Sequence, residues 1–250
     1  MQFIGIFNNN SRKRMKKVLF NAFWFVPVVL FGCFDGSFSG NGDKIYIQDE
    51  ILTKIDSKSL LVINKYGPTI RKYSEKYGVD WRLVVAVMKV ESKFNHTAES
   101  HKGARGFMQI MPATQTEIAG KLGIAEEVIN DPHGNIIGGI YYLSRLYKQF
   151  DTPQYTEENK IRLTLAAYNA GPGRIQDAQK MAAYVNDDPT EWKSVKNSMS
   201  LLSKKYSSLH RFVWVGHRPA SGYFRDWVQT ANYVESVTSY YQEYKRFIRS

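Results

Sequence analysis

One carboxylate stands at the end of an apolar helical stripe in the stretch WRLVVAVMKVES, residues 81–92. Four of its residues fall on one helical face: Trp81, Val84, Met88 and Glu91. An acid on that face is partly removed from water, which raises its pKa toward the neutral range in which a general acid works. The alternative is that Glu91, one turn from the helix end, extends into solvent or caps a loop amide.

The loop after this helix, SHKGARGFMQIMPAT at residues 100–114, has the composition of a ligand-binding loop. Its glycines allow the backbone to approach a ligand closely. The Gln109 side chain offers both a donor and an acceptor to a polar substrate. Met108 and Met111 have helical spacing and are equally consistent with core packing, which is the favoured interpretation for Met108.

A second stretch of interest is LAAYNAGPGRI, residues 165–175, where an apolar helix runs into Gly-Pro-Gly. The glycines predict the end of one helix, and Arg174 opens the next. Tyr168 can direct its phenol at a nearby carboxyl, and Asn169 can hold a loop by bonding to backbone. Taken alone, the motif is as consistent with a helix-capping turn as with a catalytic element.

The elements that must position these residues are mostly helices. Pro68 predicts a helix start and Gly78 its end, and Asp80 is a good N-cap for the helix that carries the acid. Alternating apolar patterns typical of strands are absent, so the expected fold class is mostly α. Further helices are expected at 113–122, 135–149, 157–168, 174–185 and 226–247. Gly138 and Gly139, inside one of them, indicate close helix packing.

The N-terminal part has the layout of an export signal. From Met15 to Cys33, two lysines precede an apolar run that ends in Leu-Phe-Gly-Cys. This ending predicts a lipoprotein signal over residues 1–33, with Met15 as the expected true start and Cys33 as the lipidated residue; an uncleaved N-terminal anchor is the alternative. A flexible tether is expected at 34–60, followed by one domain at 61–250.

The charge balance favours an anionic partner. The chain has a formal charge of +11, and +6 remains after the five cations that precede Cys33. No RNA-binding module or helix-turn-helix pattern is present, so nucleic acid is not expected. The abundant aromatic residues suit sugar stacking as well as ordinary packing. The five histidines show no metal-ligand spacing and are expected at the surface or in loops, so neither a metal nor another cofactor is predicted.

Three sets of residues resemble the lytic transglycosylases of the soluble-lytic-transglycosylase type, which cleave peptidoglycan and have a lysozyme-like α fold. They are Glu91-Ser92, the run from Ala98 through Gly103 to Pro112, and Ala167 to Gly173. YGVDWRL before the acid and the late Tyr233-Val234 are similar to the membrane-bound lytic transglycosylase F group. The likeness covers about 66–248, without that group's N-terminal solute-binding-like domain, and implies a lysozyme-like catalytic domain with a C-terminal helical extension.

The resemblance implies a role for each matching residue. Glu91 becomes the sole catalytic acid/base, and Tyr168 orients its carboxyl. The residues implied to bind substrate or support the substrate loop are Ser92, Ser100, Gln109, Met111, Tyr168, Asn169 and Gln229. At Gln229 the chain departs from the family, which often has a glutamate four residues before the late tyrosine.

The implied reaction is cleavage between N-acetylmuramic acid and N-acetylglucosamine that leaves a 1,6-anhydro sugar. It needs one carboxylate rather than the usual two, and Glu99 is the only other acid between Glu91 and Glu117. A goose-type lysozyme activity and a catalytically silent peptidoglycan-binding lipoprotein are the alternatives. The expected location is the bacterial envelope, with a lipid anchor in the outer membrane facing the periplasm and cell-envelope machinery as a further partner.

Overall fold

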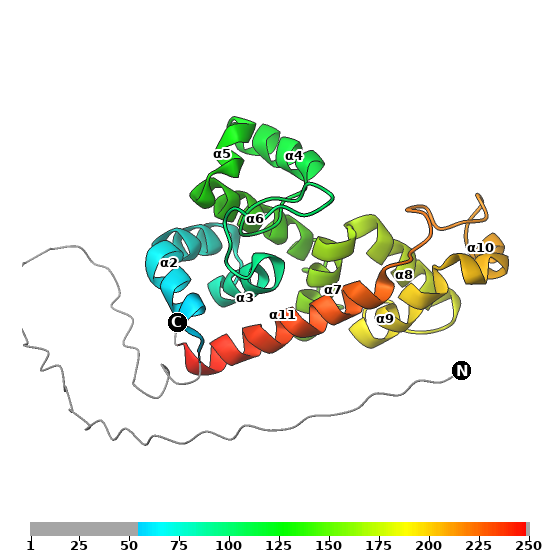
Figure 1. The fold of residues 1–250 in the computed structure, drawn as a ribbon. Helices are drawn as coiled ribbons and strands as arrows, with labels where there is room; N and C mark the ends of the chain where they lie inside the picture. Colours follow the sequence, from blue (N-terminus) through cyan, green and yellow to red (C-terminus); the bar gives the residue numbers. More distant parts are fainter. Residues whose placement is uncertain (1–54, 249–250) are drawn as a thin grey trace, which may run out of the picture. The chain divides into compact units, whose positions relative to one another are not determined.

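The computed structural model describes residues 55–248, which fold as helices joined by loops. The predicted signal segment, Cys33 and most of the expected tether lie outside the described residues. The helices are α2 (Ser57–Tyr77), α3 (Trp81–Ser92), α4 (Pro112–Leu122), α5 (Glu126–Asn130), α6 (Pro132–Tyr147), α7 (Glu157–Ala170), α8 (Pro172–Tyr184), α9 (Trp192–Leu201), the 3₁₀ turn η1 (Lys204–Tyr206), α10 (Ser207–Val213) and α11 (Trp227–Phe247) (Figure 1). Within residues 55–248 the predicted mostly α fold class is confirmed, since only isolated β-bridges interrupt the helices.

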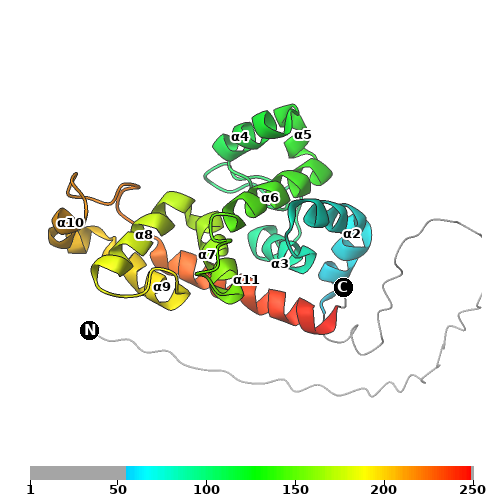
Figure 2. The same ribbon diagram turned by 180° about the vertical axis from the view of Figure 1, so that it is seen from behind.

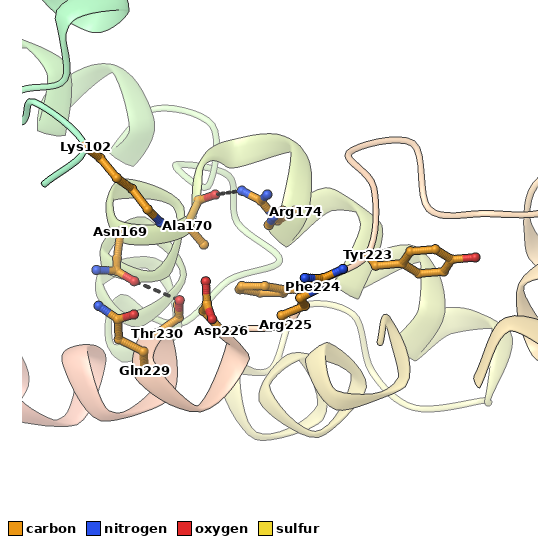
Figure 3. A pocket seen from close by; sticks show the side chains of 10 residues that line it. All are labelled: Lys102, Asn169, Ala170, Arg174, Tyr223, Phe224, Arg225, Asp226, Gln229 and Thr230. Carbon is orange, nitrogen blue, oxygen red and sulfur yellow. Dashed lines mark hydrogen bonds between the residues drawn. The ribbon is translucent and has the colours of Figure 1, made fainter. Parts of the chain in front are cut away.

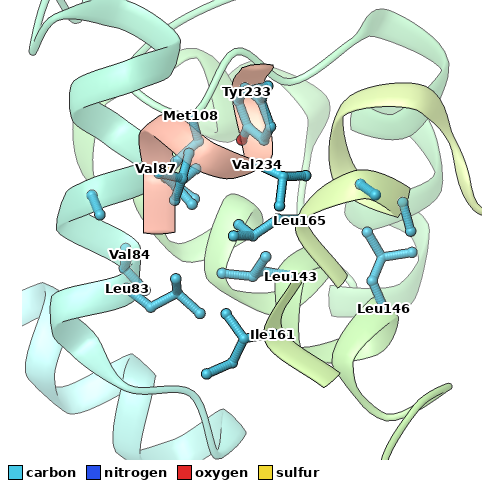
Figure 4. Packing of buried hydrophobic residues seen from close by; sticks show 14 of the residues in the cluster. Leu83, Val84, Val87, Met108, Leu143, Leu146, Ile161, Leu165, Tyr233 and Val234 are labelled. Carbon is cyan, nitrogen blue, oxygen red and sulfur yellow. The ribbon is translucent and has the colours of Figure 1, made fainter. Parts of the chain in front are cut away.

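Helix α3 lies at the centre of the fold. Its residues Leu83 to Met88 are all buried, so this helix is apolar on nearly every side rather than on one stripe. It packs against α2 and α11, and α11 continues along α7 (Figure 1 and, from behind, Figure 2). Figure 4 shows Val84 and Val87 of α3 in the same cluster as Leu165 of α7 and Val234 of α11. The last turn of α3 is therefore held from several sides.

Helix α2 corrects one prediction. It begins at Ser57, inside the range expected for the tether, and Pro68 lies within it rather than near its start. The N-cap is Asp56, whose carboxylate accepts hydrogen bonds from the Ser59 amide at 3.1 Å and its hydroxyl at 2.6 Å. A proline costs an interior helix hydrogen bond, and the buried face of α2 offsets that loss. That face consists of Ser59, Val62, Ile63, Tyr66, Gly67, Ile70 and Ser74.

Three short helices, α5, α9 and α10, had no counterpart among the predicted elements. Helix α10 also corrects the expectation that all histidines lie at the surface or in loops. The His210 side chain is fully buried, with Nε2 at 2.7 Å from the Leu201 carbonyl oxygen. The Trp214 ring lies edge-on to it at a centroid distance of 5.6 Å. His210 thus serves the packing of the region after α9.

Candidate active site

Glu91 lies in the last turn of α3, where the chain turns into the loop 93–111. Burial raises the pKa of its carboxyl from 4.5 to about 7, and the nearby Tyr233 hydroxyl acts in the opposite direction. No other carboxylate in residues 55–248 contributes to this shift. Near neutral pH the carboxyl is therefore close to half protonated, so it can both donate and accept a proton.

The hydroxyl that faces Glu91 belongs to Tyr233 of α11. It is buried and has no hydrogen-bond partner within the described part of the chain. Burial and the charge of Glu91 raise the pKa of this phenol well above 10, so it stays a hydroxyl donor. The sequence contained the signal as Tyr233-Val234, but the site residues predicted from it did not include this tyrosine.

Tyr168, predicted to orient the carboxyl of Glu91, bonds to the main chain of the loop 93–111. Its hydroxyl donates to the Met108 carbonyl oxygen at 2.7 Å instead of pointing at the carboxyl of Glu91. The ring is nevertheless close, because the charge of Glu91 is among the causes that raise the pKa of this phenol, after burial. Tyr168 therefore fixes the loop 93–111 beside the acid.

Ser92, predicted to bind substrate, is buried and bonded to main chain. Its hydroxyl lies 3.0 Å from the carbonyl oxygens of both Met88 and Phe107. A buried hydroxyl shared between two carbonyls is not free to meet a ligand. Ser92 instead joins the end of α3 to the middle of the loop, which fixes the direction in which Glu91 leaves the helix.

The loop 93–111 is also held from α6, by Asn135, a residue that the sequence analysis did not single out. The Asn135 amide accepts from the Met108 N–H at 2.8 Å and donates to the Arg105 carbonyl oxygen at 3.0 Å. A side chain at Gly106, whose φ is +77°, would lie 2.5 Å from Asn135. One at Gly139 would lie 2.5 Å from Met108, which confirms the predicted close packing of this helix.

Gln109, predicted to face the substrate, uses part of its amide within the loop. Its Nε2 donates to the carbonyl oxygens of Ala98 and Gly106, each at 3.0 Å. Two donated bonds occupy both amide hydrogens, so only Oε1 remains for a ligand. Ser100 accepts from the Ala104 amide at 2.9 Å, and Met111 is 40% exposed at the N-cap of α4.

Asn169 and Gln229 both line a pocket of about 240 Å³ (Figure 3). Asn169 was expected to bond to loop backbone, but its Oδ1 accepts from the Thr230 hydroxyl of α11 at 2.8 Å. Gln229 is exposed on the same helix. The other residues that line the pocket are Lys102, Ala170, Arg174, Tyr223, Phe224, Arg225 and Asp226.

Glu99, the other acid of the loop, is engaged elsewhere. Its carboxylate pairs with Arg105 at 3.2 Å, and both side chains are about half exposed. Over residues 55–248 the structure contains no cluster of three metal-ligating side chains and no helix that could span a membrane. The raised pKa of Glu91 suits this carboxyl to proton transfer.

Comparison with known proteins identifies a family and several proteins to which the chain is similar in sequence. Residues 68–190 match the transglycosylase SLT domain family. The chain is 34% identical over 73% of its length to the membrane-bound lytic murein transglycosylase F 1 of Alkalilimnicola ehrlichii, covering 34% of that protein. It is 30% identical over 93% of its length to the membrane-bound lytic murein transglycosylase F of Shewanella pealeana, covering 44% of that protein.

Among solved structures, the chain is similar to the 70-kDa soluble lytic transglycosylase of Escherichia coli. The identity is 27% and the TM-score 0.47, with 73% of this chain and 24% of that chain covered. The chain spans less than half the length of the curated relatives above. The family match ends at residue 190, before Gln229 and Tyr233.

Proposed function

Because residues 68–190 match the transglycosylase SLT domain family, we propose that the chain is a lytic murein transglycosylase. Its substrate is the β-1,4 bond between N-acetylmuramic acid and N-acetylglucosamine in peptidoglycan. The observation that carries the proposal is the pKa of Glu91, which burial raises to about 7. A carboxyl with that pKa can serve as an acid and then as a base within one turnover.

Two proton transfers complete the reaction. In the first, protonated Glu91 gives its proton to the glycosidic oxygen, the bond to the muramyl C1 breaks, and the glucosamine unit leaves with a free hydroxyl. In the second, the Glu91 carboxylate takes the proton of the muramyl C6 hydroxyl, whose oxygen forms the new bond to C1. The product is a 1,6-anhydromuramyl end, and the carboxyl returns to its protonated state.

Tyr233 supports the ionised half of this cycle. Its hydroxyl interacts with the carboxylate of Glu91 and favours its ionised form, although the contact is longer than an ordinary hydrogen bond. Catalytic hydrogen bonds that are long in a free enzyme often tighten in the complex with substrate. The partnerless hydroxyl is thus available to stabilise the negative charge that appears after the first proton transfer.

The goose-type hydrolytic alternative requires a second group to activate water. Glu99 is the nearest acid in sequence, and its ion pair with Arg105 on the exposed face of the loop disfavours that role. A silent peptidoglycan-binding protein has no need for an acid with a pKa near 7. Both observations favour transglycosylation over the two alternatives.

The decisive experiment is digestion of purified sacculi by the wild-type protein and by Glu91→Gln, with mass spectrometry of the products. We expect anhydromuropeptides from the wild type and none from the variant. Reducing muramic ends would indicate hydrolysis instead. No release of muropeptides by the wild type, together with retained sacculus binding, would indicate the silent binder.

The proposed location is the bacterial envelope, with a lipid anchor at Cys33 in the outer membrane. The curated relatives are named membrane-bound, which supports an envelope location. The anchor rests on the sequence pattern around Cys33. Labelling of cells with a radioactive fatty acid tests the anchor, because the wild type should incorporate the label and Cys33→Ala should not.

A further inference from the structure

The positive charge of this chain is concentrated in one stretch. Residues 192–225 contain no aspartate or glutamate, and they contain seven cations: Lys193, Lys196, Lys204, Lys205, Arg211, Arg218 and Arg225. The chain after Cys33 carries a formal charge of +6, so this stretch accounts for all of the excess. A segment of one sign attracts partners of the other sign.

The end of the basic stretch is fixed against α8 by a buried acid, Asp177. Its carboxylate accepts from the indole N–H of Trp214 at 3.2 Å and from the Ser221 amide at 2.7 Å. Ser221 in turn contacts Gly173, where a Cβ would lie only 2.4 Å from the serine hydroxyl. Residues 219–225 are therefore held beside the first turn of α8.

This placement brings three cations to the pocket shown in Figure 3. Arg225 comes from the basic stretch, Lys102 from the loop after α3, and Arg174 from α8. None of the three forms an ion pair within residues 55–248, and Arg174 has a buried Nε without a hydrogen-bond partner. Asp226 is the single acid among the lining residues, so the lining has a formal charge of +2.

The pocket lies next to the proposed catalytic group. Asn169 lines it and directly follows Tyr168, whose ring is near Glu91. On α11, Gln229 lines the pocket and Tyr233 lies one turn further on, a distance of about 6 Å along the helix axis. A ligand group in the pocket can therefore belong to the same substrate molecule that reaches Glu91.

Resting on the proposed function, we infer that this pocket binds a carboxylate of the peptide stem attached to the muramyl residue. The N-acetylated sugars of the glycan strand are neutral, whereas the stem peptide carries free carboxylates. Lysine and arginine side chains bind carboxylates through charge-assisted hydrogen bonds, which are stronger than neutral ones. The cations thus give the site a preference for strands whose stem carboxylates are free.

The test compares two substrates and two variants. The substrates are sacculi with intact stems and the same sacculi after their stem carboxylates have been converted to amides. Lys102→Ala combined with Arg225→Ala should lower kcat/KM on the first roughly tenfold, the size of one or two lost ion pairs, and leave the second unchanged. Arg218→Ala removes an exposed cation of the same stretch outside the pocket and should change neither.

An equal loss on both substrates, or no loss on either, would overturn the inference. Binding decides the question even if the wild type cleaves neither substrate, which would refute only the proposed function. Calorimetry should show that a free stem tripeptide binds the Glu91→Gln protein. When Lys102→Ala and Arg225→Ala are added to that protein, the affinity should fall roughly tenfold. The tripeptide with its carboxylates converted to amides should lose the same affinity, and equal binding of both peptides would refute the carboxylate site.

Discussion

Two regions that meet near Glu91 use their polar groups in opposite ways. In the loop 93–111, Ser100 and Gln109 bond to main chain, and Gln109 uses both of its amide hydrogens to do so. In the basic stretch 192–225, Lys196 pairs with Glu235 at 3.5 Å, whereas Arg225 is exposed and forms no ion pair within the described residues. The loop is built to hold a geometry, and the basic stretch is built to leave charge available.

The difference shows which region should tolerate change. A loop whose buried carbonyls and amides depend on a few side chains loses stability when one of them is removed, because the remaining partners stay buried without a bond. An exposed cation without a partner contributes little to folding, so its removal should affect binding alone. Substitutions in the loop should therefore change stability, and substitutions of the exposed cations should change binding without changing stability.

The largest effect is expected for Asn135→Ala in the loop scaffold. Asn135 bonds to the Met108 amide and to the carbonyl oxygens of Arg105 and Ile129. Leaving these buried groups unpaired should lower the free energy of unfolding by about 3 kcal/mol and greatly reduce cleavage, since the loop would shift. Urea denaturation measures the first effect. Asn197→Ala, an exposed asparagine on α9, is the control and should change stability by less than about 0.5 kcal/mol.

Glu91→Gln should make the protein more stable while it removes activity. The folded state raises the pKa of Glu91 from 4.5 to about 7, so the carboxyl destabilises the fold as pH rises between these values. Above pH 7 the free energy of unfolding of the variant should exceed that of the wild type by about 2–3 kcal/mol. Below about pH 4 the two free energies should be equal. Thermal denaturation across pH 3.5–8.5 measures the difference. A constant difference across this range would show that Glu91 is not desolvated.

Two tyrosines allow a finer separation of support from catalysis. Tyr233→Phe removes the hydroxyl that lowers the pKa of Glu91, so the pH profile of cleavage should move toward higher pH with roughly tenfold lower activity at its maximum. Tyr168→Phe removes the bond to Met108 and should lower stability by about 1 kcal/mol. Its pH profile should stay in place. Identical profiles for both variants would contradict the distinction.

The fold could be predicted where one rule dominated. Asp80 as an N-cap and the dense apolar pattern of α3 gave that helix its correct bounds. Pro68 misled the prediction of α2, because the local cost of a proline is smaller than the gain from a buried face that only the packed fold shows. The helices α5 and α10 have five and seven residues, too few for a periodic signal, whereas α9 has ten and was missed without a structural reason.

The candidate site shows a similar division. Glu91 stood out because an acid ended an apolar helix, and burial beside α11 accounts for its raised pKa. The partners of hydroxyls and amides could not be foreseen, since a side chain such as Ser92 or Tyr168 is equally suited to substrate and to a carbonyl. Asn135 and Tyr233 come from helices distant in sequence, so only the fold reveals that they meet the loop and the acid.

The smallest effect is expected for Gln229→Glu, which restores the acid that the resembling family often has. Gln229 is exposed, so the new charge should change activity by a factor of about three or less. Its sign separates the two regions: a negative charge in the pocket weakens carboxylate binding there, and one turn from Tyr233 it raises the pKa of Glu91 slightly further.

Cleavage of stem-bearing sacculi by Gln229→Glu should therefore fall, while cleavage of sacculi with amidated stems should change only through a small displacement of its pH profile to higher pH. Gln229→Ala is the matched control, because it removes the same amide without adding charge. If Gln229→Glu raised the rate on stem-bearing sacculi, the cations of the pocket would act on the pKa of Glu91 rather than bind the peptide. The cations of the pocket and the half-buried Glu91 would then form one electrostatic unit instead of two.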